Sequence, residues 1–579
     1  MSRRAGLVVA TLVLLAVWTL SDVASAQIVP TPPPPPIMPF PTPLPKELPK
    51  PEPPMPSILP PAPVPERRGP LPTVKVIVRE IRVLGSTVFT PQELAQVTDP
   101  YLNREITSED IESLRLALTL LYVKRGYSTS GTLVPDQAIT DGVLRIQAIE
   151  GTLSRIDVEG NFWFRSSYFT SRLLRDAGPP VNVNALQERL RLFQTDPRIE
   201  RINAELKPGE RRGESALNVR VAERRPIKAW LEYNNFATPG VGSNRVMGTI
   251  VDENLLGLGD RVSVQYGQSF GTDTNAHGSG INPNLNVSYV VPFTPYDTTF
   301  AVDYRRTDFT VIDSNVKALD INGKFELLGF TFRQPFFRTP SQEFALALTG
   351  QSESFRTSLL GNPFEFQLGS TNGLSQVSAL RFAQEYVHRT QDQVISALSR
   401  MSFGLPVMGA VVNSGPDQAT GEFFSWLGQT QLVRRLNPTR VTILARADLQ
   451  LATKHLFLIE QMAVGGRYSV RGYREFTQLG DNAFLGSFET RIPVYISAIG
   501  EELVYLVPFF DYGRAWNTDT TVDPSPEWLA SAGVGTIWNF WRGSRFELYW
   551  GQRLNPPTKA QHTNLQDYGV HVQLVVQAF

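Results

Sequence analysis

The residues of this chain that could carry chemistry are few, and their spacing argues against catalysis. One pattern matches the nucleophile elbow of serine hydrolases, the run GQSFG from Gly267 to Gly271. An elbow needs a helix directly after its strand, whereas a polar segment rich in glycine and asparagine follows here. The histidines lie at 277, 388, 455, 562 and 571, without the spacing of metal ligands, and no HExxH or phosphate-binding loop occurs. We therefore expect no enzyme, no bound metal and no cofactor.

The arginine with the most unusual surroundings lies in a glycine-rich stretch. This stretch reads YSVRGYREF from Tyr468 to Phe476, and glycines stand at 465, 466, 472 and 480. Glycine adopts positive φ without a steric cost, so the stretch suits a loop that turns tightly or lies close to another wall. An arginine in such a confined place needs a carboxylate partner. A solvated loop arginine is the alternative.

Charge and composition exclude several classes of protein. Lys+Arg and Asp+Glu both number 55 in the 579 residues, so no net charge favours nucleic acid. Cysteine is absent, which excludes disulfides and thiol chemistry. Any electrostatic function must therefore depend on a few local charges.

The first residues have the order of a secretory signal. Arg3 and Arg4 precede an apolar run from Leu7 to Leu20, and the small residues ASA end at Ala26. We expect export and cleavage after Ala26, so that residues 1–26 are a signal peptide. A membrane anchor is the alternative, but the run is shorter than the ~20 residues that a span needs. No later apolar stretch is long enough for a membrane helix.

Residues 27–73 contain a large share of the 45 prolines, in runs such as TPPPPPIMPFPTPLPKELPKPEPP. Proline lacks the amide donor and fixes φ, which predicts an extended polyproline segment. We interpret it as a periplasmic linker. A ligand for a cell-wall or periplasmic partner is the alternative.

Residues 74–151 and 152–224 read as two copies of one small α+β unit. The first copy predicts strand, helix, helix, strand, strand, beginning with VIVREIRVLG. Its long helix is predicted by apolar residues at helical spacing behind a capping pair: Ile111, Leu114, Leu118 and Leu121, behind Thr107 and Asp110. Its last strand is expected to contact the core through Val143, Ile146 and Ile149. In the second copy, Leu186, Leu190 and Phe193 share one face of a helix.

Residues 225–579 alternate apolar with polar side chains over many short segments. In RVSVQYGQS, for example, Val262, Val264 and Tyr266 share one face, and the opposite face is polar. A soluble sandwich also alternates, but charges in mid-strand and aromatics near segment ends are typical of a membrane barrel. We predict a transmembrane β-barrel of about 16 antiparallel strands.

The segment LTLLYVKRGYSTSGTLVPDQAITDGVLRIQAIEG (118–151) resembles the first POTRA domain of the two-partner secretion transporters, the hemolysin secretion/activation family. Residues 181–209 resemble the second POTRA domain, and DENLLGLGDRV (252–262) resembles the first barrel hairpin. The resemblance is carried in the first domain by Tyr122, Arg125, Gly126, Tyr127, Pro135, Gln137, Glu150 and Gly151. It covers nearly everything after Val74.

The resemblance also implies a role for the glycine-rich stretch. In the family, a loop with a VRGY motif folds back into the barrel, where its arginine meets an acid on the inner wall. In this chain the matching motif is Val470-Arg471-Gly472-Tyr473, in a loop at 465–482. The matching wall segment is PFFDYGRAW. By parity, Phe510 and Tyr512 face lipid, so Asp511 and Gly513 face the lumen. Glu489 and Arg491 are of like parity and extend the network.

The function implied is export of one large partner exoprotein, an adhesin or hemolysin-like β-helix protein, unfolded through a barrel in the bacterial outer membrane. The POTRA domains lie in the periplasm, and the barrel assembly machinery and outer-membrane lipids are further partners; nucleic acid is not. Alternatives are an outer-membrane assembly factor of the same superfamily and a simple porin. The residues expected to contact the exoprotein are Tyr122, Arg125, Gly126, Tyr127, Ile199, Ile202, Ala204 and Leu206, the last four on an edge strand open to strand addition.

Overall fold

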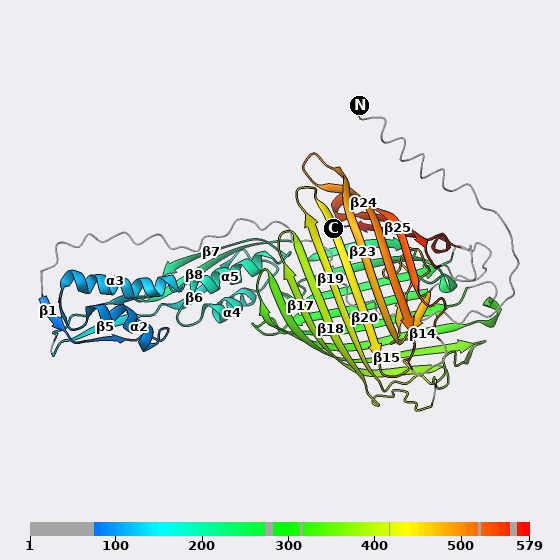
Figure 1. The fold of residues 1–579 in the computed structure, drawn as a ribbon, viewed down its shortest axis with the longest axis horizontal. Helices are drawn as coiled ribbons and strands as arrows, with labels where there is room; N and C mark the ends of the chain where they lie inside the picture. The colour runs from blue at the N-terminus through cyan, green and yellow to red at the C-terminus, as the bar shows by residue number, and fades with distance from the viewer. Residues whose placement is uncertain are drawn as a thin grey trace.

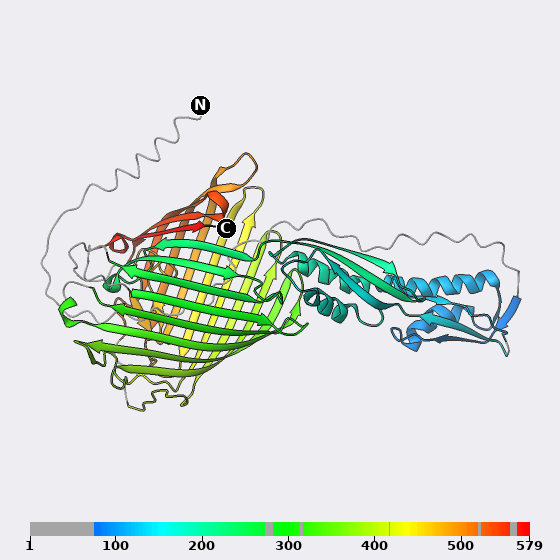
Figure 2. The same cartoon turned by 180° about the vertical axis from the view of Figure 1, so that it is seen from behind.

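The computed structural model describes residues 75–578 except 140, 272–281, 313–315, 416, 519–522 and 556–563. The predicted signal peptide (1–26) and proline-rich linker (27–73) lie outside the described residues. Two small α+β units lie in line at one end of a large barrel (Figure 1), and the view from behind shows the same order (Figure 2). Within the described ranges, no helix is both long and apolar enough to cross a membrane.

The first unit packs two helices on a mixed sheet of order β2-β5-β4. Its long helix α3 (Ser108–Lys124) begins at the predicted capping box of Thr107 and Asp110 and buries Leu114, Leu118 and Tyr122. The other elements are β1 (Lys75–Val78), β2 (Glu80–Leu84), α2 (Pro91–Thr98), η1 (Asp99–Tyr101), β3 (Arg104–Thr107), β4 (Gly131–Leu133) and β5 (Val143–Ile149).

The segment VIVREIRVLG is not the single strand that its composition predicts. After Val78 the chain changes sheets, because β1 pairs with β3 while β2 pairs with β5. The backbone N–H groups of Arg79 and Glu80 both donate to the carbonyl of Gly142, at 2.8 and 3.2 Å. This shared acceptor holds the break in place.

The predicted core contacts of β5 are correct for Ile146 but wrong for its neighbours. Leu144, Ile146 and Ala148 are buried, whereas Val143 and Ile149 are only half-buried on the other face. Side chains alternate along a strand, so Val143 and Ile149 cannot share a face with Ile146.

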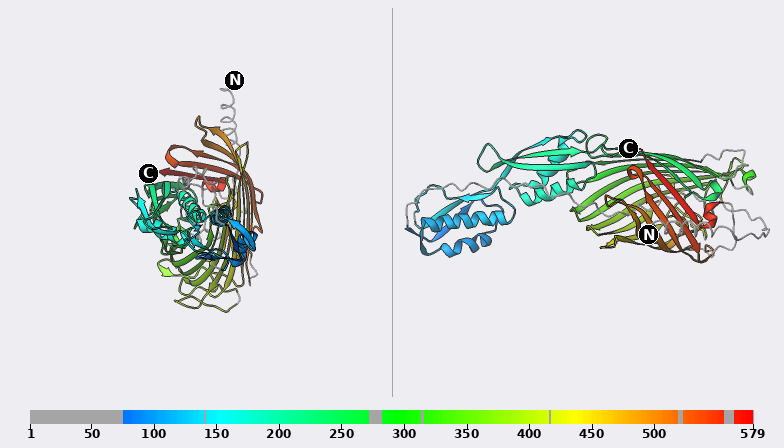
Figure 3. Two further views of the ribbon diagram at one scale, coloured as in Figure 1. Left: turned by 90° about the vertical axis from the view of Figure 1, so that its left-hand side faces the viewer. Right: turned by 90° about the horizontal axis from the view of Figure 1, so that it is seen from above.

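The second unit repeats the same order of elements around its own core. Leu186 and Leu190 are fully buried and Phe193 nearly so, as the helical spacing predicts. Its sheet order is β6-β8-β7, which leaves β7 at an edge. The elements are β6 (Thr152–Glu159), α4 (Ser166–Ala177), α5 (Val183–Gln194), β7 (Ile199–Pro208) and β8 (Glu214–Glu223). Figure 3 (right) shows this unit between the first unit and the barrel.

The rest of the described chain forms a closed antiparallel barrel of 16 strands, with the two-residue β16 (Asn362–Pro363) added to β15. The predicted fold class is confirmed. The strands are β9 (Ile227–Asn234), β10 (Asn244–Asp252), β11 (Arg261–Phe270), β12 (Asn282–Pro292), β13 (Thr299–Thr310), β14 (Asn322–Arg338), β15 (Gln342–Leu359), β17 (Leu374–Arg389), β18 (Gln393–Gly404), β19 (Phe424–Leu436), β20 (Val441–Ala452), β23 (Asn482–Ile496), β24 (Glu502–Trp516), β25 (Leu529–Asn539), β26 (Arg545–Arg553) and β27 (Val570–Gln577).

The barrel closes where β27 pairs with β9, with Gln573 opposite Asn234. Closure leaves no unpaired strand edge in the bilayer, where an unsatisfied backbone group is costly. The predicted parity holds: Val264 and Tyr266 of β11 are exposed on the outer face, and Gln265 lines the lumen. Five further short elements lie in loops: η2 (Pro239–Val241), η3 (Lys317–Leu319), η4 (Trp541–Gly543), η5 (Leu565–Tyr568) and the β21–β22 ribbon described below.

Candidate functional site

The connection between β20 and β23, residues 453–481, folds into the barrel and is here called the lumen loop. Two short strands, β21 (Met462–Val464) and β22 (Gln478–Gly480), pair as an antiparallel ribbon at its base. The predicted motif lies between them. Gly472 has a φ of 92°, and a Cβ there would lie 2.6 Å from the carbonyl oxygen of Gly551 on β26. Only glycine fits this conformation and this approach to the wall.

Arg471 is buried against the inner wall and makes two ion pairs. Its Nε and Nη2 donate to the two carboxylate oxygens of Asp511 at 2.7 and 2.8 Å, and its Nη1 donates to Glu489 at 2.6 Å. Its backbone N–H also donates to Asp511, at 3.0 Å. The side chains of Arg471 and Asp511 are 3% and 0% exposed. The structure thus brings together the arginine and the acid that the resemblance pairs.

The charges around Arg471 balance. Glu489 also accepts from Nε of Arg491 at 2.9 Å, so two arginines face two carboxylates. The guanidinium carbon of Arg471 lies 3.7 Å above the ring of Phe509, which adds a cation–π contact. A bidentate arginine–carboxylate pair is directional, so this network fixes the loop in one position. Removing one partner would leave a buried charge without compensation.

The apolar residues of the motif pack beside the ion pairs of Arg471. Val470 and Tyr473 are buried, in a cluster with Val464 and Leu485. The hydroxyl of Tyr473 donates to the carbonyls of Ala530 and Asn555 at 3.0 and 2.9 Å. A Cβ at Gly513 would lie 2.5 Å from Val464 and 2.9 Å from Val470. The close approach of the loop expected at Gly513 is therefore present.

Two further arginines of the lumen loop form ion pairs that were not predicted. Arg467 donates to Glu547 of β26 at 2.5 Å, and Arg474 pairs with Asp567. Arg467 and Arg474 both lie close to the motif in the chain. On β26, Glu547 precedes Leu548, whose side chain points outward. Strand parity could have identified Glu547 as an inner-wall acid. Asp567 lies in η5, where parity gives no signal.

The lumen loop has a second attachment to the barrel at Glu460, which precedes the motif in the chain. Glu460 accepts from Nη2 and Nη1 of Arg381 on β17, at 2.6 and 3.1 Å. Arg381 also donates to Glu353 of β15 at 3.3 Å. These three side chains are at most 7% exposed. A cavity of about 860 Å³ lies between the loop and strands β10 to β20, and these charges line it.

Two of the residues expected to contact the exoprotein, Tyr122 and Tyr127, pack within the first unit. Tyr122 is buried, and its hydroxyl donates to Ser86 and Glu150 at 2.8 and 3.0 Å. Burial raises the pKa of Tyr122 to about 12. Tyr127 packs edge-on against Tyr122. These contacts hold α3 on its sheet.

Arg125 and Gly126 join the first unit to the second. The carbonyl of Gly126 accepts from the backbone N–H of Val183 at 2.8 Å, and that of Arg125 accepts from the side chain of Asn182 at 3.3 Å. A Cβ at Gly126 would lie 2.6 Å from Asn184. The glycine therefore permits contact between the units.

The four residues expected on β7 point into the second unit. Ile199, Ile202, Ala204 and Leu206 are buried in its core, because the apolar face of a strand packs under its helices. Their side chains cannot contact an exoprotein. The backbone of β7 remains an edge, since no other strand of the described chain pairs with its outer side.

The GQSFG pattern also has no elbow, because Gly267 to Phe270 lie within β11.

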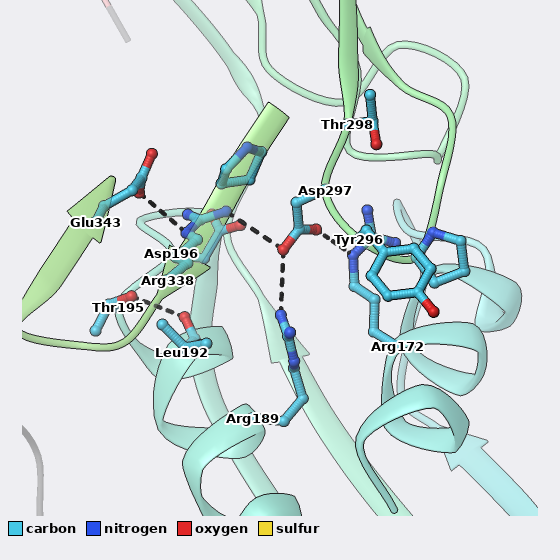
Figure 4. A network of polar contacts seen from close by, with 12 residues as sticks. Arg172, Arg189, Leu192, Thr195, Asp196, Tyr296, Asp297, Thr298, Arg338 and Glu343 are labelled. Carbon is cyan, nitrogen blue, oxygen red and sulfur yellow. Dashed lines mark hydrogen bonds and ion pairs between the residues drawn. The ribbon is translucent and has the colours of Figure 1, made fainter. Parts of the chain in front are cut away.

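Arginines of the second unit converge on one aspartate of the barrel (Figure 4). Asp297, in the turn between β12 and β13, accepts from Nε of Arg172 at 2.7 Å and from Nη1 of Arg189 at 3.2 Å. Arg338 of β14 approaches the same carboxylate at 3.6 Å. The side chains of Arg172 and Arg189 are 6% exposed, so this Asp297 junction is largely dry.

Comparison with known proteins matches both parts of the chain. Residues 76–151 match the model of the ShlB-type POTRA domain, and residues 213–537 match the haemolysin secretion/activation protein family ShlB/FhaC/HecB. The outer membrane transporter CdiB of Escherichia coli is 26% identical over 72% of this chain and 68% of its own length. The hemolysin transporter protein ShlB of Serratia marcescens is 22% identical over 78% of this chain and 77% of its own.

Solved structures show the same fold. CdiB from Escherichia coli superposes with a TM-score of 0.64 at 21% identity, covering 90% of this chain and 93% of that one. The family model spans more than half of the chain, from the last strand of the second unit to the end of β25. The chain therefore belongs to the ShlB/FhaC/HecB family of haemolysin secretion/activation proteins, the outer-membrane transporters of two-partner secretion.

Proposed function

We propose that this chain exports one large partner exoprotein, an adhesin or hemolysin-like β-helix protein, and that the second unit captures it by strand addition at β7. The observation that carries this proposal is the lumen loop: it occupies the channel and is held at two points, Arg471 and Glu460, by buried ion pairs. A simple pore has no use for such a plug. Export then requires the loop to move, while the chain itself carries out no chemical step.

The lumen suits an unfolded chain. The cavity beside the lumen loop is lined by side chains of both signs, including Asp303, Arg305 and Glu353. A wall of mixed polarity offers no large apolar surface on which an unfolded segment would stay bound. An extended chain can therefore pass without a strong binding site on the way.

Capture at β7 depends on backbone groups, because the inward side chains of this strand are buried. An extended segment can pair with such an edge by main-chain hydrogen bonds, with little demand on its sequence. Asn203 and Glu205 are exposed on the outer face of β7, so they would lie beside a bound segment.

The test uses photo-crosslinking in cells that co-express this chain and the exoprotein whose secretion depends on it. A benzophenone amino acid at Asn203 or Glu205 should crosslink to the exoprotein during export. The matched control is Arg155 on β6, the opposite edge of the same sheet, which should not crosslink. Equal crosslinking from both edges, or none from β7 while export proceeds, would contradict capture at β7.

A further inference from the structure

The loop between β6 and α4 presents two large apolar side chains to the outside. Phe162 is 81% exposed and Trp163 is 37% exposed. Their rings contact each other edge-to-face, with centroids 5.0 Å apart. Apolar rings exposed together in this way mark a surface that meets another apolar phase.

This loop is held rigidly in its exposed conformation. The carboxylate of Glu223 accepts from the backbone N–H groups of Phe162, Trp163 and Phe164 at 3.1, 2.5 and 3.2 Å. The side chain of Asn161 donates to the carbonyl of Phe164 at 2.8 Å. Phe164 itself packs into the core of the second unit. These bonds hold the backbone of the loop in the conformation that exposes the two outer rings.

The loop lies directly against the barrel. The backbone N–H of Arg165 donates to the carbonyl of Gly257 at 2.8 Å, in the turn between β10 and β11. A Cβ at Gly257 would lie 2.9 Å from the carbonyl oxygen of Trp163, so the two segments touch. The same turn exposes Leu255 and Leu256, at 51% and 48%. We call Phe162, Trp163, Leu255 and Leu256 the base patch.

The base patch continues the lipid-facing surface of the barrel. Leu231 of β9 and Ile250 of β10 are 56% and 60% exposed on the outer face, the face that a membrane barrel turns to lipid. The turn that carries Leu255 and Leu256 begins directly after β10. Aromatic rings are favoured where hydrocarbon meets headgroups. Arg165 is exposed beside the patch, and its charge suits lipid phosphates.

We propose that the base patch inserts into the periplasmic leaflet of the outer membrane, so that the second unit is bound to the lipid surface as well as to the barrel. The partner is a phospholipid bilayer, not the exoprotein. The patch then limits how far the second unit can swing away from the mouth of the channel.

The chain lacks cysteine, so single-cysteine labelling tests this directly. The full chain carrying Phe162→Cys, labelled with an environment-sensitive fluorophore, is reconstituted in phosphatidylcholine–phosphatidylglycerol vesicles. Lipids with a spin label high on the acyl chain should quench position 162 at least half as strongly as Phe330→Cys, a lipid-facing strand position. Aqueous iodide should quench it several-fold less than Glu210→Cys, in the distant turn between β7 and β8. Heat-modifiable migration confirms that each labelled barrel is folded.

Two results would overturn the proposal. One is a label at 162 that behaves like the label at Glu210, accessible to iodide and unaffected by lipid quenchers. The other is a label that is shielded only when the exoprotein is added, which would assign the patch to the exoprotein. Trp163→Cys provides a second position, and it should follow Phe162→Cys.

Discussion

The lumen loop and the Asp297 junction solve the same electrostatic problem with opposite arrangements. In the lumen, one loop arginine, Arg471, bridges two wall carboxylates, Asp511 and Glu489. At the junction, one wall carboxylate, Asp297, binds two arginines that come from the second unit. In both networks the arginines come from the segment that packs against the barrel and the acids come from the barrel, whereas Glu460 of the lumen loop and Arg381 of β17 have the reverse arrangement. Arginine suits this role because its planar fork can pair with more than one acceptor.

The two networks differ in what remains when one member is lost. Without Arg471, Asp511 keeps only the hydroxyl of Ser487 as a side-chain donor, at 2.7 Å. Without Asp297, Arg189 keeps its ion pair with Asp176, and Arg172 keeps its hydrogen bond to the carbonyl of Tyr168 at 3.0 Å. The loop network has one essential member, whereas the junction has substitutes for each contact. The loop should therefore respond to substitution more strongly.

Arg471→Ala should have the largest effect. It leaves the buried carboxylate of Asp511 unpaired, at a cost of about 3–5 kcal/mol to the docked loop. Asp511→Ala should cost less, because Arg471 keeps Glu489 at 2.6 Å. The measurement is secretion of the exoprotein, with heat-modifiable migration to show that the barrel is folded.

The double variant sharpens this result. Contacting residues couple by about 0.5–3 kcal/mol, so the defects of Arg471→Ala and Asp511→Ala should not add. Additive defects in correctly folded barrels would show that the two residues act separately. That outcome would contradict the pairing as the basis of loop function.

Asp297→Asn should loosen the second unit with a smaller cost, about 1–3 kcal/mol, because both arginines keep other partners. Spin labels at Glu210→Cys and Leu360→Cys, on the second unit and the barrel, should show a broader distance distribution. The matched control is Arg338→Gln, whose 45%-exposed side chain approaches Asp297 only at 3.6 Å. A distribution as narrow as that of the parent chain would show that other contacts hold the junction.

Glu460→Gln should slightly weaken the attachment of the lumen loop to Arg381 of β17. Arg381 keeps Glu353, and the carbonyl of residue 460 keeps the side chain of Gln450, so the expected change is about 1 kcal/mol, or roughly fivefold in the open fraction. Channel openings in planar bilayers measure this. Lys454→Gln, in the same loop but 45% exposed, should leave the openings unchanged.

The loop network was predicted from the family resemblance, which pairs the arginine of the VRGY motif with an acid of the inner wall, together with strand alternation in the wall segments. The VRGY motif identifies Arg471. Strict alternation in PFFDYGRAW and GSFETRIPV assigns Asp511, Glu489 and Arg491 to the inner face. The barrel was predictable for the same reason, since alternation repeats in every strand. The prediction of one strand over VIVREIRVLG failed because the chain changes sheets at Arg79.

The Asp297 junction could not be predicted from one sequence. Its arginines lie in α4 and α5, and its aspartate lies in a barrel turn more than 100 residues further along the chain. Arg172 and Arg189 look like ordinary charges on amphipathic helices, and only the docking of the second unit buries them. Tyr122 and Gly126 show the converse difficulty. Their place in a recognisable motif suggested contact with the exoprotein, whereas the structure uses them for packing and for contact between units.

The exposed ion pair of Glu93 and Arg125 should have the smallest effect on stability. Glu93 accepts hydrogen bonds from Thr90 at the start of α2, and it pairs with Arg125. Its pKa falls to about 2, first through the backbone N–H of Thr90 and then through Arg125. Because the folded pKa lies below the ordinary value of 4.5, Glu93 stabilises α2 above pH 4.5, and this contribution is lost as pH falls toward 2.

Hydrogen exchange of residues 91–98 in the full chain should show this loss. Protection of α2, corrected for intrinsic exchange, should decline between about pH 4.5 and 2 in the parent chain but not by this route in Glu93→Gln. Arg125→Gln should move the decline to higher pH only slightly, because the Thr90 bonds remain. A large shift in Arg125→Gln would show that this exposed ion pair is as strong as the buried ones, which solvent screening argues against.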